Sequence, residues 1–294
     1  MRSQAPDNSR PVRLESPEDG VVRRTLRTEL LLVLALSLGA SAVSSLISFT
    51  GALTAPGGLA DQAAQLNSSR APGRPWLDLA WQLFAIVTAL VPVALVAHLL
   101  LRERLRRGDG GVAGDAGGDP GRGVRPDGGG LRVLGFDLRR PGWDLGWGAA
   151  VAAAIGGCGI GLYLAAQAAG LNLTVEPESL PGTWWKYPVL IASAIQNSVV
   201  EEVIVVGYLL RRLDQLGWSP LASLSASAVL RGSYHLYQGI GGFFGNMAMG
   251  VVFVLLYRRW GRVGPLVAAH ALIDIVAFIG YALLAGRVDW LPTP

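Results

Sequence analysis

Two adjacent glutamates, Glu201 and Glu202, interrupt the otherwise apolar stretch SAIQNSVVEEVIVVGYLL at residues 193–210. On membrane-insertion scales an acid at the centre of a span costs about 2.5–3.5 kcal/mol, whereas each Leu, Ile, Val or Phe returns only about 0.3–0.6 kcal/mol. The pair therefore cancels nearly all of this segment's drive to insert. Ser or Asn would serve as packing contacts without a charge, so we interpret the two acids as functional.

Further ionisable residues occur on the apolar segments that follow. His235 comes four residues after Arg231 in LRGSYHLYQG, and Asp274 comes four residues after His270 in VAAHALIDIVAF. Residues four apart lie on the same face of a helix, one turn from each other. Together with the glutamates these side chains form a candidate site. His98 has no acidic companion, and we interpret it as incidental.

The composition indicates a membrane protein, because 51% of the residues are hydrophobic, only 16% are charged and the mean hydropathy is +0.40. Apolar stretches long enough to cross a bilayer recur about seven times. They lie near residues 27–53, 78–101, 145–170, 187–210, 219–237, 243–257 and 264–285. We therefore predict an all-α fold, a polytopic bundle of about seven transmembrane helices.

Basic residues predict the orientation, since they favour cytoplasmic loops. Arginines are frequent in the N-terminal tail, in LRERLRRG after the second span and in YRRWGR at 257–262. We expect a multi-pass protein of the cell (plasma) membrane with a cytoplasmic N-terminus. The net charge of +4 is then mostly a topology signal, so membrane lipid is an expected partner and nucleic acid is not.

The chain divides into four segments of different character. We expect a disordered cytoplasmic tail over 1–26, two N-terminal transmembrane helices over 27–102, a Gly/Arg-rich cytoplasmic loop over 103–142 and a core over 143–290 that carries the ionisable residues. Within the core, GGCGIG around Cys158 predicts close helix packing through small residues.

The order of these residues resembles a known family. A Glu-Glu pair, a His on a following helix and His-x-x-x-Asn/Asp on a later one are similar to the motifs of the CPBP family of intramembrane endopeptidases, bacterial relatives of the type II CAAX prenyl endopeptidase. The resemblance covers roughly residues 140–285. It implies that 143–290 is a CPBP-like intramembrane protease core acting on a membrane-associated or lipidated protein or peptide substrate.

The resemblance also implies roles for the matching positions. Glu201 would be the general base, with Glu202 beside it; His235 matches the second motif, and His270 and Asp274 match the third. Because consecutive residues on a helix point about 100° apart, we expect one glutamate to face water and substrate and the other to hold a histidine or an arginine. The histidines, with the aspartate orienting an imidazole, would stabilise the oxyanion.

Two positions depart from the family pattern. The first motif usually ends in arginine where this chain has Val206, and the second usually begins with phenylalanine where it has Arg231. We interpret both as one change that moved the arginine to the next span and kept a cation near the carboxylates. We therefore expect the arginine within about 4 Å of a glutamate, with Glu202 as its partner.

Other chemistry stays open at this point. Glu201, His235 and His270 could instead bind zinc with an open position for water. We favour catalysis without a cofactor, because the family resemblance leans that way and the chain contains no HExxH motif. A polar-solute or proton transporter and a catalytically inactive membrane adaptor are the alternative functions.

Overall fold

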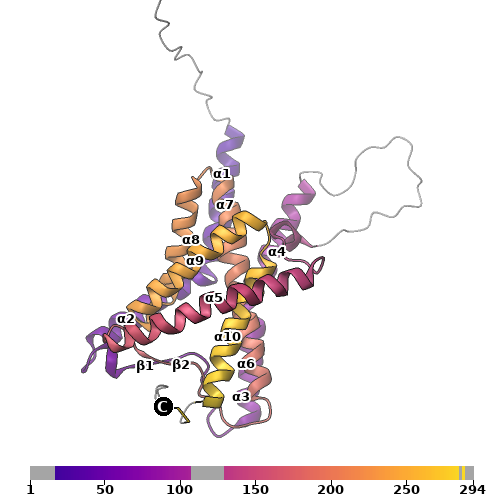
Figure 1. Cartoon of the computed structure of the whole chain (residues 1–294). Coiled ribbons are helices and arrows are strands. Elements are labelled where there is room, and N and C mark those ends of the chain that lie inside the picture. The colour runs from indigo at the N-terminus through magenta and orange to yellow at the C-terminus, as the bar shows by residue number, and fades with distance from the viewer. Residues whose placement is uncertain (1–16, 107–128, 285–286, 289–294) are drawn as a thin grey trace, which may run out of the picture.

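A computed structural model of the chain describes residues 17–106, 129–284 and 287–288. The described part is almost wholly helical (Figure 1), which confirms the all-α class. The α-helices are α1 (Pro17–Ala35), α2 (Leu38–Thr54), α3 (Pro75–Ala89), α4 (Val91–Arg106), α5 (Pro141–Ala168), α6 (Lys186–Glu201), α7 (Leu209–Gln215), α8 (Pro220–Tyr234), α9 (Ile240–Trp260) and α10 (Gly264–Leu284).

Five described helices are long and apolar enough to cross a membrane. Two of them are composite: α3 and α4 together cover Pro75–Arg106, and α6, a π-helical segment and α7 together cover Lys186–Gln215. The pair α1 and α2 adds a sixth span if it is counted as one, although it is bent by 48°. This is close to the expected seven. The missing span is the stretch 219–237, which forms the 15-residue helix α8.

The N-terminal boundary differs from the expected one. Residues 17–26 belong to α1 and are not a disordered tail. The segment begins with Pro-Glu-Asp, residue types that favour the first turn of a helix, and its later turns place Leu30 and Val33 in the core. Residues 1–16 and 107–128, which hold the rest of the tail and most of the Gly-rich loop, lie outside the described residues.

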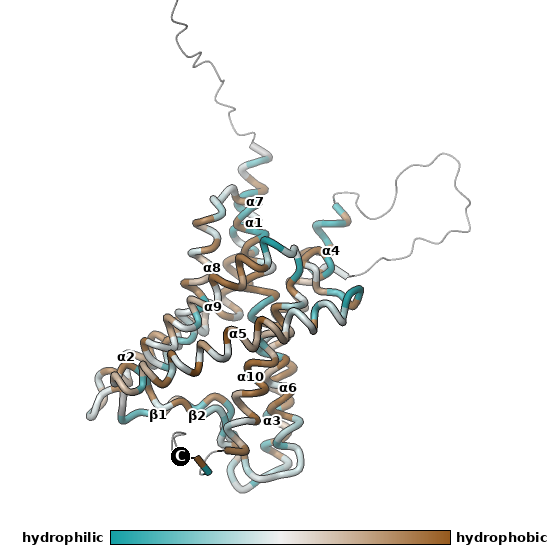
Figure 2. The backbone as a smooth tube through the Cα atoms, viewed as in Figure 1, coloured by the Kyte–Doolittle hydropathy of each residue, from teal (hydrophilic) through white to brown (hydrophobic). Residues whose placement is uncertain are grey.

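Hydrophilic residues gather at the beginning of α1 and the end of α4, while α5, α9 and α10 are mostly apolar along their length (Figure 2). The glycines of the GGCGIG stretch in α5 do not pack closely against a neighbour, contrary to expectation. A Cβ atom added at Gly156, Gly157, Gly159 or Gly161 would meet no atom within 4 Å, and Cys158 is exposed. This part of the helix therefore presents its small residues to the surroundings of the bundle, whereas Gly148 nearer its start packs closely against Ala268 of α10.

A short parallel ribbon lies at the end of the bundle away from the beginning of α1 (Figure 1). Strand β1 (Ala63–Gln65) pairs with β2 (Thr174–Glu176), with Ala64 opposite Val175. The ribbon joins two loops that are far apart in the sequence. It therefore ties the connection between α2 and α3 to the connection between α5 and α6.

Helices α8, α9 and α10 each contact the π-helical segment between α6 and α7. Helix α10 packs against α5 and α6, and α8 packs against α9 and α2. The buried Arg212 of α7 fastens the N-terminal helices to the same unit, because it donates to Glu103 of α4 at 2.8 Å and to Glu29 of α1 at 3.1 Å. The helices outside the core are thus fixed against the span that carries the two glutamates.

The turn between α9 and α10 is fixed by Arg262. Its guanidinium donates to Asp144 at 2.7 Å and to Asp137 at 3.1 Å. Burial alone would raise the pKa of Asp137, but hydrogen bonds from the Arg139 amide and from Arg262 outweigh it and hold that pKa below the ordinary value. The start of α10 is therefore anchored to the start of α5.

Candidate active site

The two glutamates lie where the helix changes its winding. Glu201 is the last residue of α6, and Glu202 begins the π-helical segment Glu202–Tyr208. Such segments occur often at functional sites. Glu202 is fully buried, whereas Glu201 is 8% exposed and lines a cavity. Glu201 therefore lies beside a cavity and Glu202 faces other side chains; that Glu201 faces water and substrate stays a prediction.

Helix α8 docks directly on the π-helical segment. The Ser227 hydroxyl donates to the backbone carbonyl of Val205 at 2.8 Å. Both residues are buried, so the bond provides a partner for a carbonyl inside the bundle. It also fixes the register of α8, and Arg231 follows one turn later.

Arg231 contacts both carboxylates, in agreement with its expected position near the glutamates. Its Nη2 atom donates to the two oxygens of Glu202, each at 2.7 Å, and its Nη1 atom donates to Glu201 Oε2 at 3.3 Å. The guanidinium is fully buried and lies over the Phe253 ring, 5.3 Å from its centroid. The predicted ion pair is confirmed, with Glu202 as the main partner.

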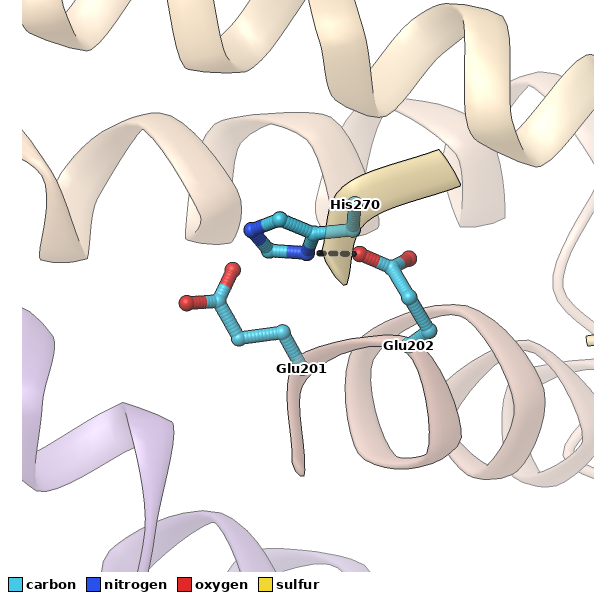
Figure 3. Close-up of side chains that lie close together, drawn as sticks. All are labelled: Glu201, Glu202 and His270. Carbon is cyan, nitrogen blue, oxygen red and sulfur yellow. Dashed lines mark hydrogen bonds and ion pairs between the residues drawn. The ribbon is translucent and has the colours of Figure 1, made fainter. Parts of the chain in front are cut away.

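His270 of α10 completes the surroundings of Glu202. Its Nδ1 atom lies 2.7 Å from Glu202 Oε1 (Figure 3). Its Nε2 atom lies 3.7 Å from Asp274 Oδ1, and both residues line the cavity. Glu202 therefore holds the histidine of one helix and the arginine of another.

Glu201 is held through only one of its oxygens. Oε2 accepts a hydrogen bond from the Tyr234 hydroxyl at 2.8 Å and from Arg231, and it lies 3.6 Å from His235 Nε2. Among the described residues, no protein group is hydrogen-bonded to Oε1. Tyr234 was missed by the sequence reasoning, although its position beside His235 and three residues after Arg231 was an available signal.

His235 lies just beyond the end of α8. Counting along a span of 219–237 places it nearer the outer end than Glu201, but α8 ends at Tyr234 and brings His235 to the level of the glutamate. The Gln238 side-chain amide lies 3.4 Å from Nδ1. Because an amide nitrogen can only donate, this contact favours the tautomer in which Nδ1 accepts and Nε2 carries the proton. That Nε2 atom is buried and has no hydrogen-bond partner among the described residues.

The cavity beside Glu201 has a volume of about 740 Å³. Its lining includes the ionisable side chains of His235, His270 and Asp274 and the amide side chains of Gln196 and Asn197. The opposite wall comes from the N-terminal helices, where α1 meets α2 and where α3 meets α4. Residues of this wall are Leu36, Ser37, Leu38, Ala40, Ser41, Thr88, Ala89, Val91, Pro92 and Leu95. Sequence reasoning confined to the ionisable residues did not find this wall.

One group of side chains has the composition of a metal site. The ligand atoms of Glu201, Glu202 and His270 lie within 4.8 Å of one another. Among the described residues this group does not include His235, which the zinc alternative required. Arg231 already donates to both glutamates, so a divalent cation there would be placed beside a fixed positive charge.

The fold and this site define a multi-pass helical membrane protein with a buried centre of carboxylates, histidines and an arginine. Residues 183–276 match the family model described as "Type II CAAX prenyl endopeptidase Rce1-like". The match contains every candidate site residue, confirms the CPBP/CAAX family resemblance and supports a CAAX-type intramembrane protease. It does not extend to α1–α4. No curated protein and no solved structure matched the chain.

Proposed function

We propose that the protein is an intramembrane endopeptidase that hydrolyses peptide bonds of a membrane-associated or lipidated protein with water activated by Glu201. The observation that carries this proposal is the asymmetry of the Glu201 carboxylate. Tyr234 and Arg231 hold Oε2, while the side chain lines a cavity large enough for a substrate segment. The free Oε1 atom can therefore accept a proton from a water in that cavity.

The reaction follows from this arrangement. Oε1 of Glu201 takes a proton from water as the water oxygen bonds to the carbonyl carbon of the substrate. The tetrahedral intermediate collapses when the C–N bond breaks, and the same proton passes from Glu201 to the leaving amine. Glu201 ends the cycle as a carboxylate, so protons and electrons balance without a further reactant.

The histidines supply donors for the oxyanion of that intermediate. His235 carries its proton on Nε2, which has no partner among the described residues and lies beside Glu201. His270 is held by Glu202 through Nδ1, which leaves Nε2 on the cavity side near Asp274. In its doubly protonated form His270 would provide the second donor. Its ring is held by Glu202, and a donor fixed in advance is what stabilisation of a developing oxyanion requires.

Glu202 and Arg231 serve as positioning residues in this scheme. Glu202 is fully buried and does not line the cavity, so it touches no substrate. Its carboxylate orients His270 and Arg231 at once. Arg231 in turn donates to Oε2 of Glu201 and offsets the charge of the two buried acids.

Catalysis without a metal is part of the proposal. The supporting observation is the guanidinium that contacts two of the three closest ligand candidates. If zinc did bind, Glu201, Glu202 and His270 would hold it, and it would supply a Lewis acid.

Membrane lipid is the partner expected around the helices. The expected cytoplasmic position of the N-terminus can be tested with reporter proteins fused to each end of the chain.

The test is cleavage of a peptide library by the purified protein in detergent or in vesicles. Glu201→Gln should abolish cleavage while the protein stays folded, because the amide keeps the shape of the side chain and loses its basicity. Glu29→Gln is the matched control: it makes the same change on α1, at a residue whose partner Arg212 keeps its bond to Glu103. Cleavage retained in a folded Glu201→Gln protein would overturn the mechanism.

A further inference from the structure

A second cavity of about 340 Å³ lies between α2 and β1. Strand β1 and the preceding residue Gln62 line one part of it, and Ser48, Gly51 and Ala52 of α2 line another. The lining also includes Leu173 and Tyr237. Most of these side chains are small, so an additional backbone could approach β1 closely here.

Tyr237 lines both this second cavity and the cavity beside Glu201. Its backbone amide donates to Ser45 Oγ of α2 at 2.6 Å, and its hydroxyl accepts from the Gln238 amide at 3.1 Å. The same amide nitrogen lies 3.4 Å from His235 Nδ1. The residue at the junction of the two cavities is thus hydrogen-bonded, through one side chain, to a histidine of the candidate active site.

One continuous segment lines both cavities. Residues 62–65 line the second cavity, and Leu66 and Asn67 line the first. Residues 63–65 form β1, and the chain bends at Leu66 and Asn67. The segment 62–67 therefore leads from the second cavity to the space beside Glu201.

The outer edge of β1 is open. The Gln62 carbonyl accepts from Thr174, and the Leu66 amide donates to Glu176, so even-numbered residues bond to β2. In a parallel ladder the alternate residues point the other way, which directs the backbone groups of Ala63 and Gln65 away from β2. Within the described residues these groups have no other backbone partner, and both side chains are exposed.

We propose that residues 62–67 bind an extended segment of the polypeptide substrate, which adds to β1 as a further strand, passes Tyr237 and presents its scissile bond to Glu201. Strand addition uses backbone hydrogen bonds for affinity and cavities for alternate side chains, and the open edge and the second cavity supply both. The proposal deepens the proposed function and rests on it. A lipid chain in the second cavity is the competing occupant.

A scan of N-methylated substrates tests the backbone pairing. Starting from a peptide that the protein cleaves, each amide on the side that reaches the second cavity is methylated in turn. Strand addition predicts an alternating result, in which every second N-methyl group lowers kcat/KM by about tenfold or more and the intervening ones are tolerated. A flat profile would overturn the proposal, because a lipid-like or purely side-chain contact has no such period.

A plug in the second cavity gives an independent readout. A Cβ atom at Gly51 meets no atom within 4 Å, so Gly51→Trp can fill the cavity without forcing the helix to move. The matched control is Gly157→Trp on α5, where a Cβ atom also meets nothing and which lines neither cavity. Gly51→Trp should raise KM for the long peptide and leave a truncated peptide unaffected, whereas the control should change neither. Equal effects of the two variants would contradict the proposal.

A measurement of peptide binding distinguishes failure of this proposal from failure of the proposed function. Hydrogen exchange of full-length Glu201→Gln protein is measured with and without the cleaved peptide, or with the peptide library as a mixture if none is cleaved. We expect slower exchange of the Ala63 and Gln65 amides. Protection without cleavage by the wild type would refute the protease and keep the strand site; cleavage without protection would refute the strand site alone.

Discussion

The Nη2 atom of Arg231 donates to both carboxylate oxygens of Glu202, each at 2.7 Å, across the contact between α8 and the π-helical segment. Glu202 Oε1 also lies 2.7 Å from His270 Nδ1 of α10. One buried carboxylate therefore links the three helices that carry the site. The arginine is the close cationic partner that a carboxylate buried at this depth requires.

Removal of that arginine should be severe. Arg231→Leu leaves two buried carboxylates without their cation, and breaking a buried ion pair costs about 3–5 kcal/mol. We expect a lower unfolding temperature in detergent and loss of cleavage. Arg258→Leu is the matched control, since Arg258 pairs with Asp214 at a partly exposed position, where such a pair is worth about 0–1 kcal/mol.

The same variant tests whether the arginine has moved between helices. Val206 is fully buried and packs in one cluster with Phe253, the ring that the Arg231 guanidinium covers. Val206→Arg combined with Arg231→Leu should therefore return a cation to the glutamates and restore part of the stability and activity. A double variant that folds and stays inactive would show that the two positions are not equivalent.

Tyr234 should act as a positioning residue for the base. Its hydroxyl donates to Glu201 Oε2 at 2.8 Å, so Tyr234→Phe frees that oxygen and removes a donor that favours the carboxylate. We expect kcat to fall by about tenfold with KM unchanged, because the base is then held less firmly in position. Tyr187→Phe, at the start of α6, is the control. A lower unfolding temperature together with equal losses in kcat and binding would indicate a packing role only.

Much of this site follows from residue type and spacing. An acid inside an apolar span is costly enough to imply a function. Spacings of four residues, which put side chains on one face of a helix, predicted that Arg231 lies near His235 and His270 near Asp274. The ion pair to Glu202 then followed, because a buried cation requires a carboxylate. Membrane composition fixed the all-α class for a similar reason, since a spanning segment must satisfy its own backbone.

Other features depend on contacts that a single sequence does not reveal. In the π-helical segment, the backbone carbonyl of Val205 accepts a hydrogen bond from Ser227 of α8. Helix α8 is shorter than its apolar stretch because the chain turns at His235. The cavity wall from α1–α4 consists of Leu, Ser, Ala, Val, Thr and Pro residues, types that do not by themselves indicate a site. Tyr234 is beside His235 in the sequence, which was a signal for a place in the site, but its bond to Glu201 is known only from the structure.

Chelation should leave activity unchanged if the reaction needs no metal. The expected outcome is full cleavage after dialysis against a strong chelator, with no stimulation by added zinc. Metal content of the purified protein, measured by mass spectrometry, provides a readout that does not depend on activity. Inactivation by the chelator and recovery with zinc would instead assign Glu201, Glu202 and His270 as ligands.

Gly250 of α9 should be required for the arginine to reach the glutamates. A Cβ atom there would lie 3.1 Å from Arg231 Cδ and 3.1 Å from Ala228 Cα, so Gly250→Ala must push α8 or the arginine away. The cost of such overpacking is about 1–3 kcal/mol, and the longer distance to Glu202 should lower activity as well. Gly245→Ala on the same helix is the matched control, because its Cβ atom would meet only the flexible tip of Leu162 at 3.2 Å. Unfolding temperature and cleavage rate are measured for both variants. If Gly250→Ala lost no more activity than Gly245→Ala, the close approach of α9 would not be what holds Arg231 against the carboxylates.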